Sequence, residues 1–324
     1  MGSDGADRAR GHGPLPLLLR RAQEHPLRAG PPGRSPSPAR HRVRRLQRVA
    51  VHAAVVVDGR LLVVDGALPW TVLAHGETPA AALRRTLGDG SEVEGLLAVH
   101  DGRREVEHAG GPVDVHTVHL VLAARAPRPP AGEWLDVAGR GERWPLVADA
   151  LVAVEEAELR RLAPGEDPDV PVVRQRLACY AVVVADGALL LTRLSPLTPS
   201  PGRWTLPGGG VDHGEHPVAA VVREVHEETG MDVEVTGLAE VGSEHFTGRS
   251  PRGVLEDFHA VRILVTATPT RVRVPEVLDV GGSTDLARWV PFEEMSGVGL
   301  VGVAQRGLTL ALSRDAEGSA RREP

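Results

Sequence analysis

The stretch that decides the fold reads GGVDHGEHPVAAVVREVHEETGM, from Gly209 to Met231. Pro217 suits the first turn of an α-helix, where its missing N–H costs nothing. Gly230 suits the position just after the last turn, because glycine adopts the left-handed conformation that often ends a helix. The sequence therefore predicts a helix between these two residues. Its apolar stripe consists of valines at helical spacing: Val218, Val221, Val222 and Val225.

Three glutamates share a neighbouring arc of this helix. Glu224, Glu227 and Glu228 lie three and four residues apart, so their Cβ atoms are roughly 5–6 Å from one another. Like charges at that spacing destabilise a helix and raise one another's pKa unless a cation compensates. Arg223 stands one turn before Glu227 and can pair with it. Since Mg²⁺ and Mn²⁺ prefer carboxylate oxygens, the cluster indicates a divalent-metal site, to which Glu215 can add a fourth carboxylate.

A solvated acidic helix face is the ordinary explanation of such a cluster, and the surrounding spacing argues against it. The segment fits Gly-x5-Glu-x7-Arg-Glu-U-x-Glu-Glu-x-Gly-U, with U apolar, at every fixed position from Gly209 to Met231. A chance match anywhere in such a chain is on the order of 10⁻⁵. The glycines at 208, 209 and 210 also allow the backbone to come close to a metal or a phosphate.

On these residues the segment resembles the defining motif of the Nudix hydrolase family, and the likeness in motif and flanking strands covers 176–313. The resemblance implies a mixed β-sheet sandwiched between helices, with the motif forming a loop, a helix and a second loop. It implies hydrolysis of a nucleoside diphosphate linked to another group, which gives a nucleoside monophosphate and the phosphorylated group. It also implies Mg²⁺ or Mn²⁺ as the cofactor.

The resemblance assigns a role to each residue of the motif. Glu224, Glu227 and Glu228 are expected to hold the metal, directly or through water, and the carbonyl of Gly208 to add a ligand. Arg223 is expected to orient the glutamates. Catalysis is therefore expected to rest on Glu224, Arg223 and Glu227, with Glu224 as the first choice for the base that takes a proton from water.

Residues outside the helix are weaker candidates. The base in this family is not always a residue of the motif, so Glu244, Glu256 and Asp257 are alternatives for that role. Aromatic and basic residues after the motif can stack on a nucleobase or pair with phosphate. The candidates for substrate binding are Glu215, Phe246, Arg249, Arg252, Glu256 and Asp257.

Four blocks of residues 48–160 recur in the same order in residues 176–313, which indicates an internal duplication. Ala53–Val63 (AAVVVDGRLLV) matches Ala181–Leu191 (AVVVADGALLL), and each predicts a hairpin around Asp-Gly. The offsets between copies grow from 128 to 145, as expected if the second copy has longer loops. The other matched blocks begin at Trp70 and Trp204, at Asp114 and Asp257, and at Arg143 and Arg288.

The first copy lacks the acidic residues of the second. Thr86, Asp89 and Gly90 stand where the second copy has its three glutamates, whereas Glu77 and Arg85 remain. This copy is interpreted as a degenerate domain that pairs with the active copy or completes its pocket. The predicted fold is two tandem Nudix-like α/β/α sandwich domains with mixed β-sheets. The expected segments are a disordered Arg/Pro-rich tail (1–46), the degenerate domain (47–162), a linker (163–175), the catalytic domain (176–313) and a disordered tail (314–324).

The composition of the 324-residue chain limits the remaining functions. Its net charge of −6 argues against a nucleic-acid partner. No apolar run approaches the ~20 residues of a membrane span, and a single cysteine, Cys179, fits a reducing cytoplasm. The expected partners are a small nucleotide substrate and, through pairing within the chain or as a homodimer, a second domain. The alternative function is a non-catalytic nucleotide sensor or regulator on the same fold.

Overall fold

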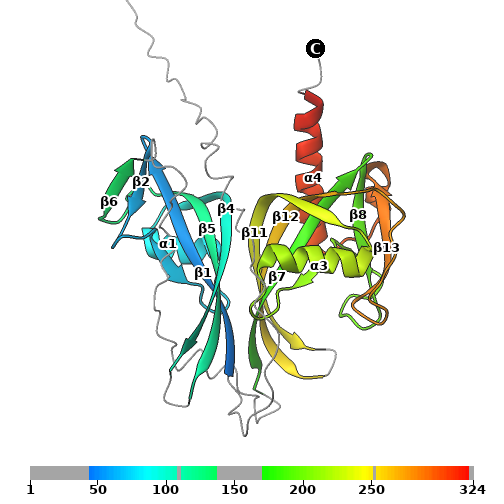
Figure 1. The fold of residues 1–324 in the computed structure, drawn as a ribbon, viewed down its shortest axis with the longest axis horizontal. Coiled ribbons are helices and arrows are strands. Elements are labelled where there is room, and N and C mark those ends of the chain that lie inside the picture. The colour runs from blue at the N-terminus through cyan, green and yellow to red at the C-terminus, as the bar shows by residue number, and fades with distance from the viewer. Residues whose placement is uncertain (1–43, 108–110, 137–169, 251–252, 321–324) are drawn as a thin grey trace, which may run out of the picture.

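The chain folds into two halves that lie side by side, each built on one mixed β-sheet (Figure 1). The computed structural model describes residues 44–107, 111–136, 170–250 and 253–320, with side chains described up to 314. Most of the predicted tail at 1–46 and of the predicted linker at 163–175, as well as the block that begins at Arg143, lies outside the described residues.

The first sheet contains a central parallel pair flanked by antiparallel strands. Its strands are β1 (Arg44–Val57), β2 (Arg60–Val63), β3 (Trp70–Val72), β4 (Glu92–Val106), β5 (Val113–Arg125) and β6 (Glu133–Asp136). Their order is β4-β5-β1-β2-β6, and β3 also pairs with β1. Strands β1 and β5 are parallel, and the other pairs are antiparallel.

The second sheet has the same arrangement with one additional short strand. Its strands are β7 (Val172–Ala185), β8 (Ala188–Leu194), β9 (Trp204–Thr205), β10 (Gly208–Gly210), β11 (Val233–Arg249), β12 (Leu255–Pro269) and β13 (Thr284–Pro291). Their order is β11-β12-β7-β8-β13, with β10 pairing to β7 and β9 to β8. Here β7 and β12 form the parallel pair.

The two sheets agree in register as well as in order. Gln47 of β1 lies opposite His116 of β5, and Gln175 of β7 lies opposite His259 of β12. The amide nitrogen of each glutamine lies close to Nδ1 of its histidine, at 3.1 and 3.0 Å respectively. Both histidines are fully buried. A repeated buried polar pair at the same register supports the predicted duplication.

The sequence matched Trp70 with Trp204, and the strand register shows that this match is wrong. Trp70 lies opposite His52 in the first sheet, the place that Gly208 takes opposite Tyr180 in the second. Trp204, the expected counterpart of Trp70, belongs to β9 and pairs with β8. The two tryptophans are therefore not equivalent: Trp70 stacks on the ring of His52, with centroids 5.9 Å apart. The residues missing from the first half lie before β3, and the loop after β3 is as long as the loop after β10.

Helices cover the sheets as the apolar patterns require. Helix α1 (Pro79–Leu87) packs in the first half, and α3 (Pro217–Thr229) packs on the equivalent face of the second sheet. A short 3-10 helix, η2 (Phe292–Gly297), precedes α4 (Gly302–Ala320). Alternating residues of β7 pack with α3 on one face and with α4 on the other. The second half is therefore an α/β/α sandwich, as predicted, whereas the described part of the first half has a helix on one face.

The two halves share one hydrophobic core. A single cluster of buried side chains includes Val51 and Leu120 from the first half and Val221 and Ile263 from the second. Strand β4 lies beside β11 where the halves meet (Figure 1). Since burial of apolar surface drives association, each half would expose part of this cluster without the other.

Three predicted boundaries differ from the structure. Strand β1 begins at Arg44, inside the predicted tail, and β7 begins at Val172, inside the predicted linker. Both strands are extended by backbone pairing to β5 and β12, which a charged composition does not reveal. Helix α4 continues to Ala320, into the predicted disordered tail at 314–324, because a helix already anchored by packing adds residues at little cost.

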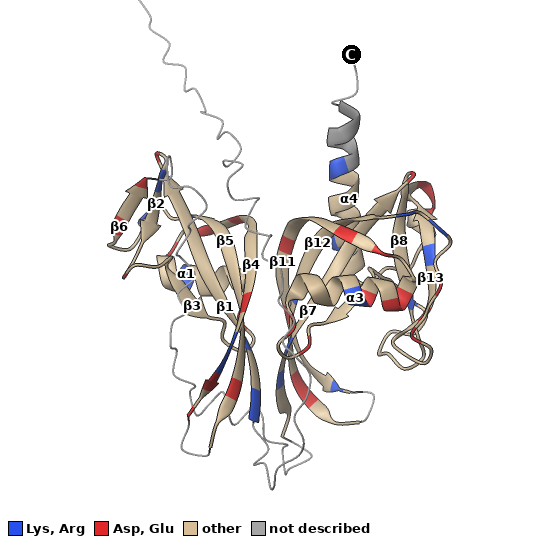
Figure 2. Cartoon of the chain, in the orientation of Figure 1, with Lys and Arg blue, Asp and Glu red and all other residues tan. Residues whose placement is uncertain are grey.

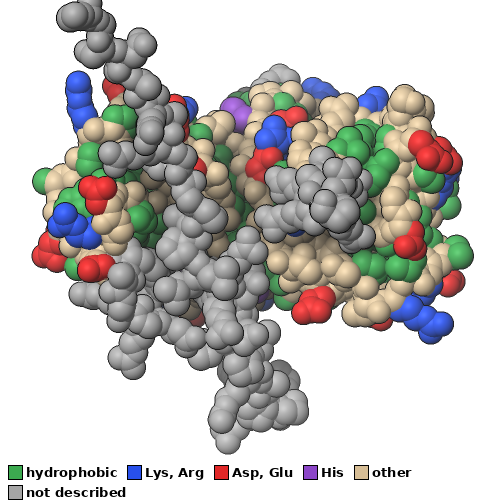
Figure 3. Space-filling view, turned by 90° about the horizontal axis from the view of Figure 1, so that it is seen from above, with side chains coloured by type: hydrophobic (Ala, Val, Ile, Leu, Met, Phe, Trp, Pro, Cys, Tyr) green, Lys and Arg blue, Asp and Glu red, His purple; other side chains and the backbone are tan. Residues whose placement is uncertain are grey.

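The described surface mixes charged and apolar side chains, and apolar patches on one face of the second half are bordered by acidic and basic groups (Figure 3). The most exposed large apolar side chains are Val274 and Val280, at 87% and 92%. Singly exposed apolar residues are ordinary. None of the described helices is both long and apolar enough to cross a membrane.

Candidate active site

Helix α3 and the glycines before it build the candidate site. The helix begins at Pro217, as predicted, and His216 caps it by accepting a backbone N–H of the first turn at 3.1 Å. It ends at Gly230, whose φ of 64° is left-handed. Val221 and Val225 are fully buried, so the packing of the valine stripe fixes the orientation of the helix. Its acidic residues gather toward its C-terminal end (Figure 2).

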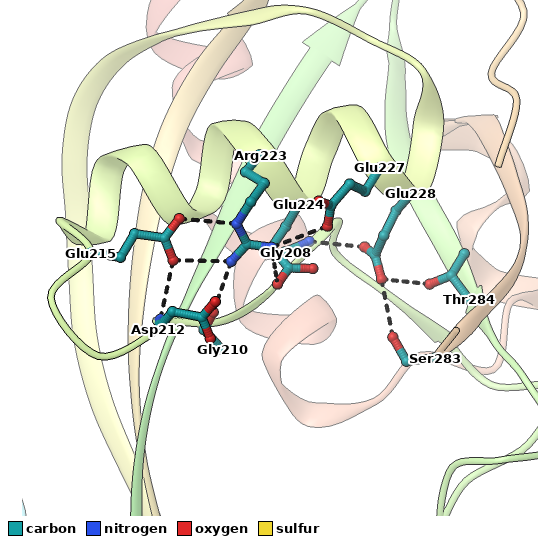
Figure 4. Close-up of polar contacts among 10 residues, drawn as sticks. All are labelled: Gly208, Gly210, Asp212, Glu215, Arg223, Glu224, Glu227, Glu228, Ser283 and Thr284. Carbon is teal, nitrogen blue, oxygen red and sulfur yellow. Dashed lines mark hydrogen bonds and ion pairs between the residues drawn. The ribbon is translucent and has the colours of Figure 1, made fainter. Parts of the chain in front are cut away.

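The guanidinium of Arg223 joins the acidic residues of the site (Figure 4). Its Nε and Nη2 donate to the two oxygens of Glu215 at 2.9 and 3.0 Å. Its Nη1 donates to Glu224 at 2.9 Å and to Glu227 at 3.0 Å. The bonds with Glu215 raise the pKa of Arg223 and lower that of Glu215. The arginine therefore holds Glu224 and Glu227 beside each other.

The glycines allow the loop to lie directly against the helix. Gly208 has a φ of 139°, and a Cβ there would collide with the backbone of β7. A Cβ on Gly209 would lie 2.6 Å from the carboxylate carbon of Glu224. A Cβ on Gly210 would collide with the guanidinium of Arg176. Larger residues at these positions would displace the charged groups of the site.

Glu228 is turned into the protein rather than toward the arginine (Figure 4). Its Oε2 accepts the backbone N–H of Gly208 at 3.0 Å, and its Oε1 accepts the hydroxyl of Thr284 at 2.6 Å. Burial raises the pKa of Glu228 to about 7, although these hydrogen bonds act in the opposite direction. Glu228 therefore links the helix to the glycine loop and to the start of β13.

The other two glutamates are more open. The side chain of Glu224 is 18% exposed and that of Glu227 is 43% exposed. Burial raises the pKa of Glu224, and the charge of Glu227 adds to this shift, whereas Arg223 opposes it. Across the described ranges, the one trio of histidine, cysteine or acidic residues with ligand atoms within 4.8 Å of one another lies elsewhere. The expected grouping of three glutamates is thus two beside Arg223 and one buried behind them.

The first half contains the same framework without the glutamates. Arg85 donates through Nε and Nη2 to Glu77 at 3.0 and 2.9 Å, as Arg223 does to Glu215. Its Nη1 donates to the hydroxyl of Thr71 at 2.7 Å. By register Thr71 corresponds to Gly209. A side chain therefore occupies the place that the carboxylate of Glu224 takes in the second half.

The residues that stand in for the glutamates cannot replace them. Thr86 bonds to the carbonyl of Ala82 in its own helix at 3.0 Å. Helix α1 ends at Leu87, so Asp89 and Gly90 lie beyond it rather than on a last turn. The first half thus has no counterpart, in its described residues, of the acidic end of α3.

Two of the downstream candidates, Asp257 and Phe246, lie far along the β11–β12 hairpin from the glycine loop. Gly209 lies across β7 from Ile263, and Asp257 is six residues earlier on the same strand, roughly 20 Å along it. Phe246 packs on Phe258, with ring centroids 5.5 Å apart. The structure does not bring either candidate to Glu224.

The charged candidates of the hairpin have partners there. Glu256 accepts from Arg174 at 2.8 Å, and Glu244 pairs with Arg262. Arg249 donates to the carbonyl of Gly253 at 2.9 Å. Arg252 lies outside the described residues. Glu215, also a candidate for substrate binding, has both oxygens bonded to Arg223.

Sequence reasoning missed the basic residues beside the site. Arg176 contacts Gly210 and lies close enough to Glu224 to oppose the rise in its pKa that burial causes. Arg262 lies close enough to Tyr180 to oppose the rise in the pKa of its hydroxyl that burial causes. Arg176 and Tyr180 alternate with the buried residues of β7, so they share the face away from α3. The signal that could have identified this face is the alternation of side chains along a strand. Arg176 and Tyr180 are an even number of residues apart, and the apolar residues that face α3 stand at the odd-numbered positions between them.

Comparison with known proteins finds a family model that matches the region of the site. The family model described as the NUDIX domain matches residues 174–308. An RNA pyrophosphohydrolase from Agrobacterium fabrum is 56% identical over 41 residues, which are 13% of this chain and 24% of that protein. A nucleoside triphosphatase NudI from an Enterobacter species is 37% identical over 67 residues, 20% of this chain and 48% of that protein.

The chain thus spans less than half the length of these two curated relatives. Among solved structures, a MutT NUDIX hydrolase from Burkholderia pseudomallei is 26% identical, with a TM-score of 0.33, over 42% of this chain and 97% of that one. The family match includes β7, the glycine loop, α3 and β13, which together carry the site described above. Residues 174–308 of this chain, which carry the site, therefore match the model of the NUDIX domain.

Proposed function

We propose that the NUDIX domain hydrolyses a diphosphate bond in a nucleoside diphosphate linked to another group. The products are a nucleoside monophosphate and the phosphorylated group. The observation that carries this proposal is the position of Arg223, which holds Glu224 and Glu227 beside a loop of glycines. Oxygen ligands next to an open backbone suit a divalent cation and a phosphate. The names of the two relatives, a pyrophosphohydrolase and a triphosphatase, support the same class of bond.

The residues of the site fit Mg²⁺ or Mn²⁺ as the cofactor. The side-chain ligands offered are all oxygens, the type that these hard cations prefer. Four carboxylates with one guanidinium among them leave a net negative charge, which a cation would balance. We assign Glu224 and Glu227 as ligands, joined by Glu228 and the carbonyl of Gly208. Oε1 of Glu228 accepts hydrogen bonds from Thr284 and Ser283, whereas Oε2 accepts one, from Gly208, and still has a lone pair to offer.

The metal, when bound, supplies neutralisation of phosphate charge and a lower pKa for the attacking water. Glu224 takes a proton from that water while the water oxygen forms a bond to phosphorus. The bond between this phosphorus and the bridging oxygen breaks, and the other phosphate leaves with that oxygen. Burial raises the pKa of Glu224, which makes its carboxylate a better proton acceptor. Arg223 positions this carboxylate at 2.9 Å, and Glu215 fixes Arg223 from the other side.

The basic face of the sheet is the proposed place for the substrate phosphates. Arg176 lies against Gly210, and Tyr180, near Arg262, lies opposite Gly208, so a cation and an aromatic ring flank the glycine loop. Guanidinium groups bind phosphate with two parallel hydrogen bonds. Among the hairpin candidates, Phe246 and Asp257 are too far along the strands to serve here.

The first half is proposed to be a degenerate copy of the domain that stabilises the active one. The shared hydrophobic core and the repeated arginine–glutamate framework support this role. We also retain a cytoplasmic location as a proposal.

A substrate screen tests the proposed function. Nucleoside diphosphate derivatives, including ADP-ribose-like compounds and oxidised nucleoside triphosphates, are incubated with the full chain and Mg²⁺ or Mn²⁺, and products are separated by chromatography. We expect at least one compound to give a nucleoside monophosphate, and Glu224→Gln to reduce that rate by ~10²-fold or more. Tight binding of a compound without turnover would favour the sensor instead.

A further inference from the structure

Two matching contacts join the halves, and each brings a loop of one half to strands of the other. In the first contact, His213 of the second half lies 3.2 Å from Asp114 of the first. Asp114 also accepts from Nε of Arg103, at 2.8 and 3.0 Å. The carboxylate is only 8% exposed. At this contact the charge of the aspartate is balanced by a permanent cation.

In the second contact the roles of the halves are exchanged. Nε2 of His75, from the first half, lies 3.3 Å from Oδ2 of Asp257 of the second. Nε2 of His245 lies 2.5 Å from the other oxygen, Oδ1. The rings of His75 and His245 stand nearly perpendicular, with centroids 5.1 Å apart. Two imidazole nitrogens thus face two oxygens of one carboxylate.

The two contacts occupy equivalent positions of the duplicated fold. His75 precedes Glu77 by two residues, as His213 precedes Glu215. Asp114 and Asp257 each stand two residues before the buried histidine at the matched register. A left-handed glycine accompanies each contact: Gly76 lies against the ring of His245, and Gly214 against the side chain of Arg103.

Each contact consists of a histidine, an aspartate and a third residue. The two contacts differ in the third residue, which is Arg103 in the first and His245 in the second. His245 lies opposite His259 in its sheet, as Arg103 lies opposite His116. A guanidinium can only donate hydrogen bonds, whereas a neutral imidazole offers a lone pair to a metal. The second contact consequently has a carboxylate and two imidazoles, the ligand types of zinc sites.

We propose that His75, His245 and Asp257 form a zinc site that joins the two halves. Their candidate ligand atoms all lie within 4.8 Å of one another. Tetrahedral zinc with bonds of about 2.0–2.1 Å needs ligand atoms roughly 3.3 Å apart, so shifts of about 1 Å complete the geometry. His245 is 42% exposed and can move by that amount. Three protein ligands leave a fourth position for water.

The zinc site is separate from the proposed catalytic site. Asp257 lies roughly 20 Å along the sheet from the level of the glycine loop, and its trio uses imidazole ligands that Mg²⁺ disfavours. Because His75 comes from one half and the other two ligands from the other, bound zinc ties the halves together. The site thus stabilises the pairing that buries the shared core.

Metal analysis of the full, untagged chain tests this proposal. The protein is treated with chelator, dialysed against Zn²⁺ in buffer with millimolar Mg²⁺ to occupy carboxylate sites, and its bound zinc is measured. We expect about one zinc per chain and a higher thermal midpoint with zinc. His245→Arg, which copies the first contact, is expected to lose both effects. Arg103→His gives that contact the same trio and is expected to raise the content to about two.

Two controls keep the result unambiguous. Asp257→Asn preserves the shape of the side chain and is expected to lose zinc as well, should His245→Arg fail to fold. Glu227→Gln is expected to keep its zinc, which separates this site from the catalytic one. Wild-type protein that binds no more zinc than Asp257→Asn would overturn the proposal, whatever the outcome of the substrate screen.

Discussion

The guanidinium of Arg85 donates to the hydroxyl of Thr71 at 2.7 Å, where the equivalent nitrogen of Arg223 reaches two glutamates. The two arginines are otherwise held alike, each by two hydrogen bonds to a glutamate eight residues earlier. The framework of the site is thus present in both halves, and only one half places acidic groups around it.

Replacing Arg223 with lysine tests whether this framework serves catalysis. A single ammonium cannot reproduce the fork that contacts Glu215 and Glu224 at once. We expect Arg223→Lys to reduce kcat by about 10²-fold, measured on the substrate found in the screen. The matched change Arg85→Lys is expected to leave kcat within about twofold while lowering stability in urea. Equal losses of kcat in both variants would show that the halves share the chemistry.

Gly209→Ala tests the close approach of loop and helix. The added Cβ would lie 2.6 Å from the carboxylate of Glu224 and must displace it. We expect a fall in kcat of roughly 10- to 100-fold with the folded state retained, as followed by circular dichroism. Gly302→Ala is the control, because a Cβ at Gly302 meets nothing within 4 Å. Full activity in Gly209→Ala would mean that the position of Glu224 is not critical.

Separating the halves tests the role of the first one. The shared core includes side chains of both halves, so residues 170–324 alone would expose apolar surface. We expect this fragment to self-associate, as measured by sedimentation at several concentrations. A monomeric fragment with the activity of the full chain would refute the stabilising role of the first half.

The buried His52 predicts how stability depends on pH. Burial lowers the pKa of His52 to about 3, and the nearby His119 adds to this. Below about pH 6.5, His52 binds a proton in the unfolded chain but stays neutral in the folded chain. The free energy of unfolding therefore falls as pH drops from 6.5 toward 3. Urea titrations at pH 6.5 and 5.5 should show a loss of up to about 1.4 kcal/mol from this group.

His52→Gln removes that titration and is expected to flatten the dependence in this range. An identical slope in wild type and His52→Gln would contradict the assignment.

The sequence predicted the local structure of the site well. Pro217 and Gly230 bound α3 where expected, since helix termini depend on local backbone preferences. The repeat in the sequence also indicated two sheets of similar strand order, because the buried strands of the two halves have similar apolar residues. The match of Trp70 with Trp204 was wrong, because similar residue types do not fix the register of a strand. Register is set by pairing across the sheet, and Trp70 holds the position in the first sheet that Gly208 holds in the second.

What the sequence did not predict comes from contacts between distant segments. Helical spacing places Glu228 next to Glu227, yet hydrogen bonds from Gly208 and Thr284 turn it inward. The contact between His75 and Asp257 joins residues of different halves. Neither could be foreseen without the arrangement of the two sheets.

Among the described residues, we propose one catalytic site, at the acidic end of α3. Measurements of kcat on Glu228→Gln and Asp89→Ala, with the same substrate and Mg²⁺, test this proposal. Glu228→Gln should lower kcat by about 10²-fold or more, and Asp89→Ala, which lies beyond the end of α1, should leave it within about twofold. Undiminished hydrolysis by Glu228→Gln would contradict the account.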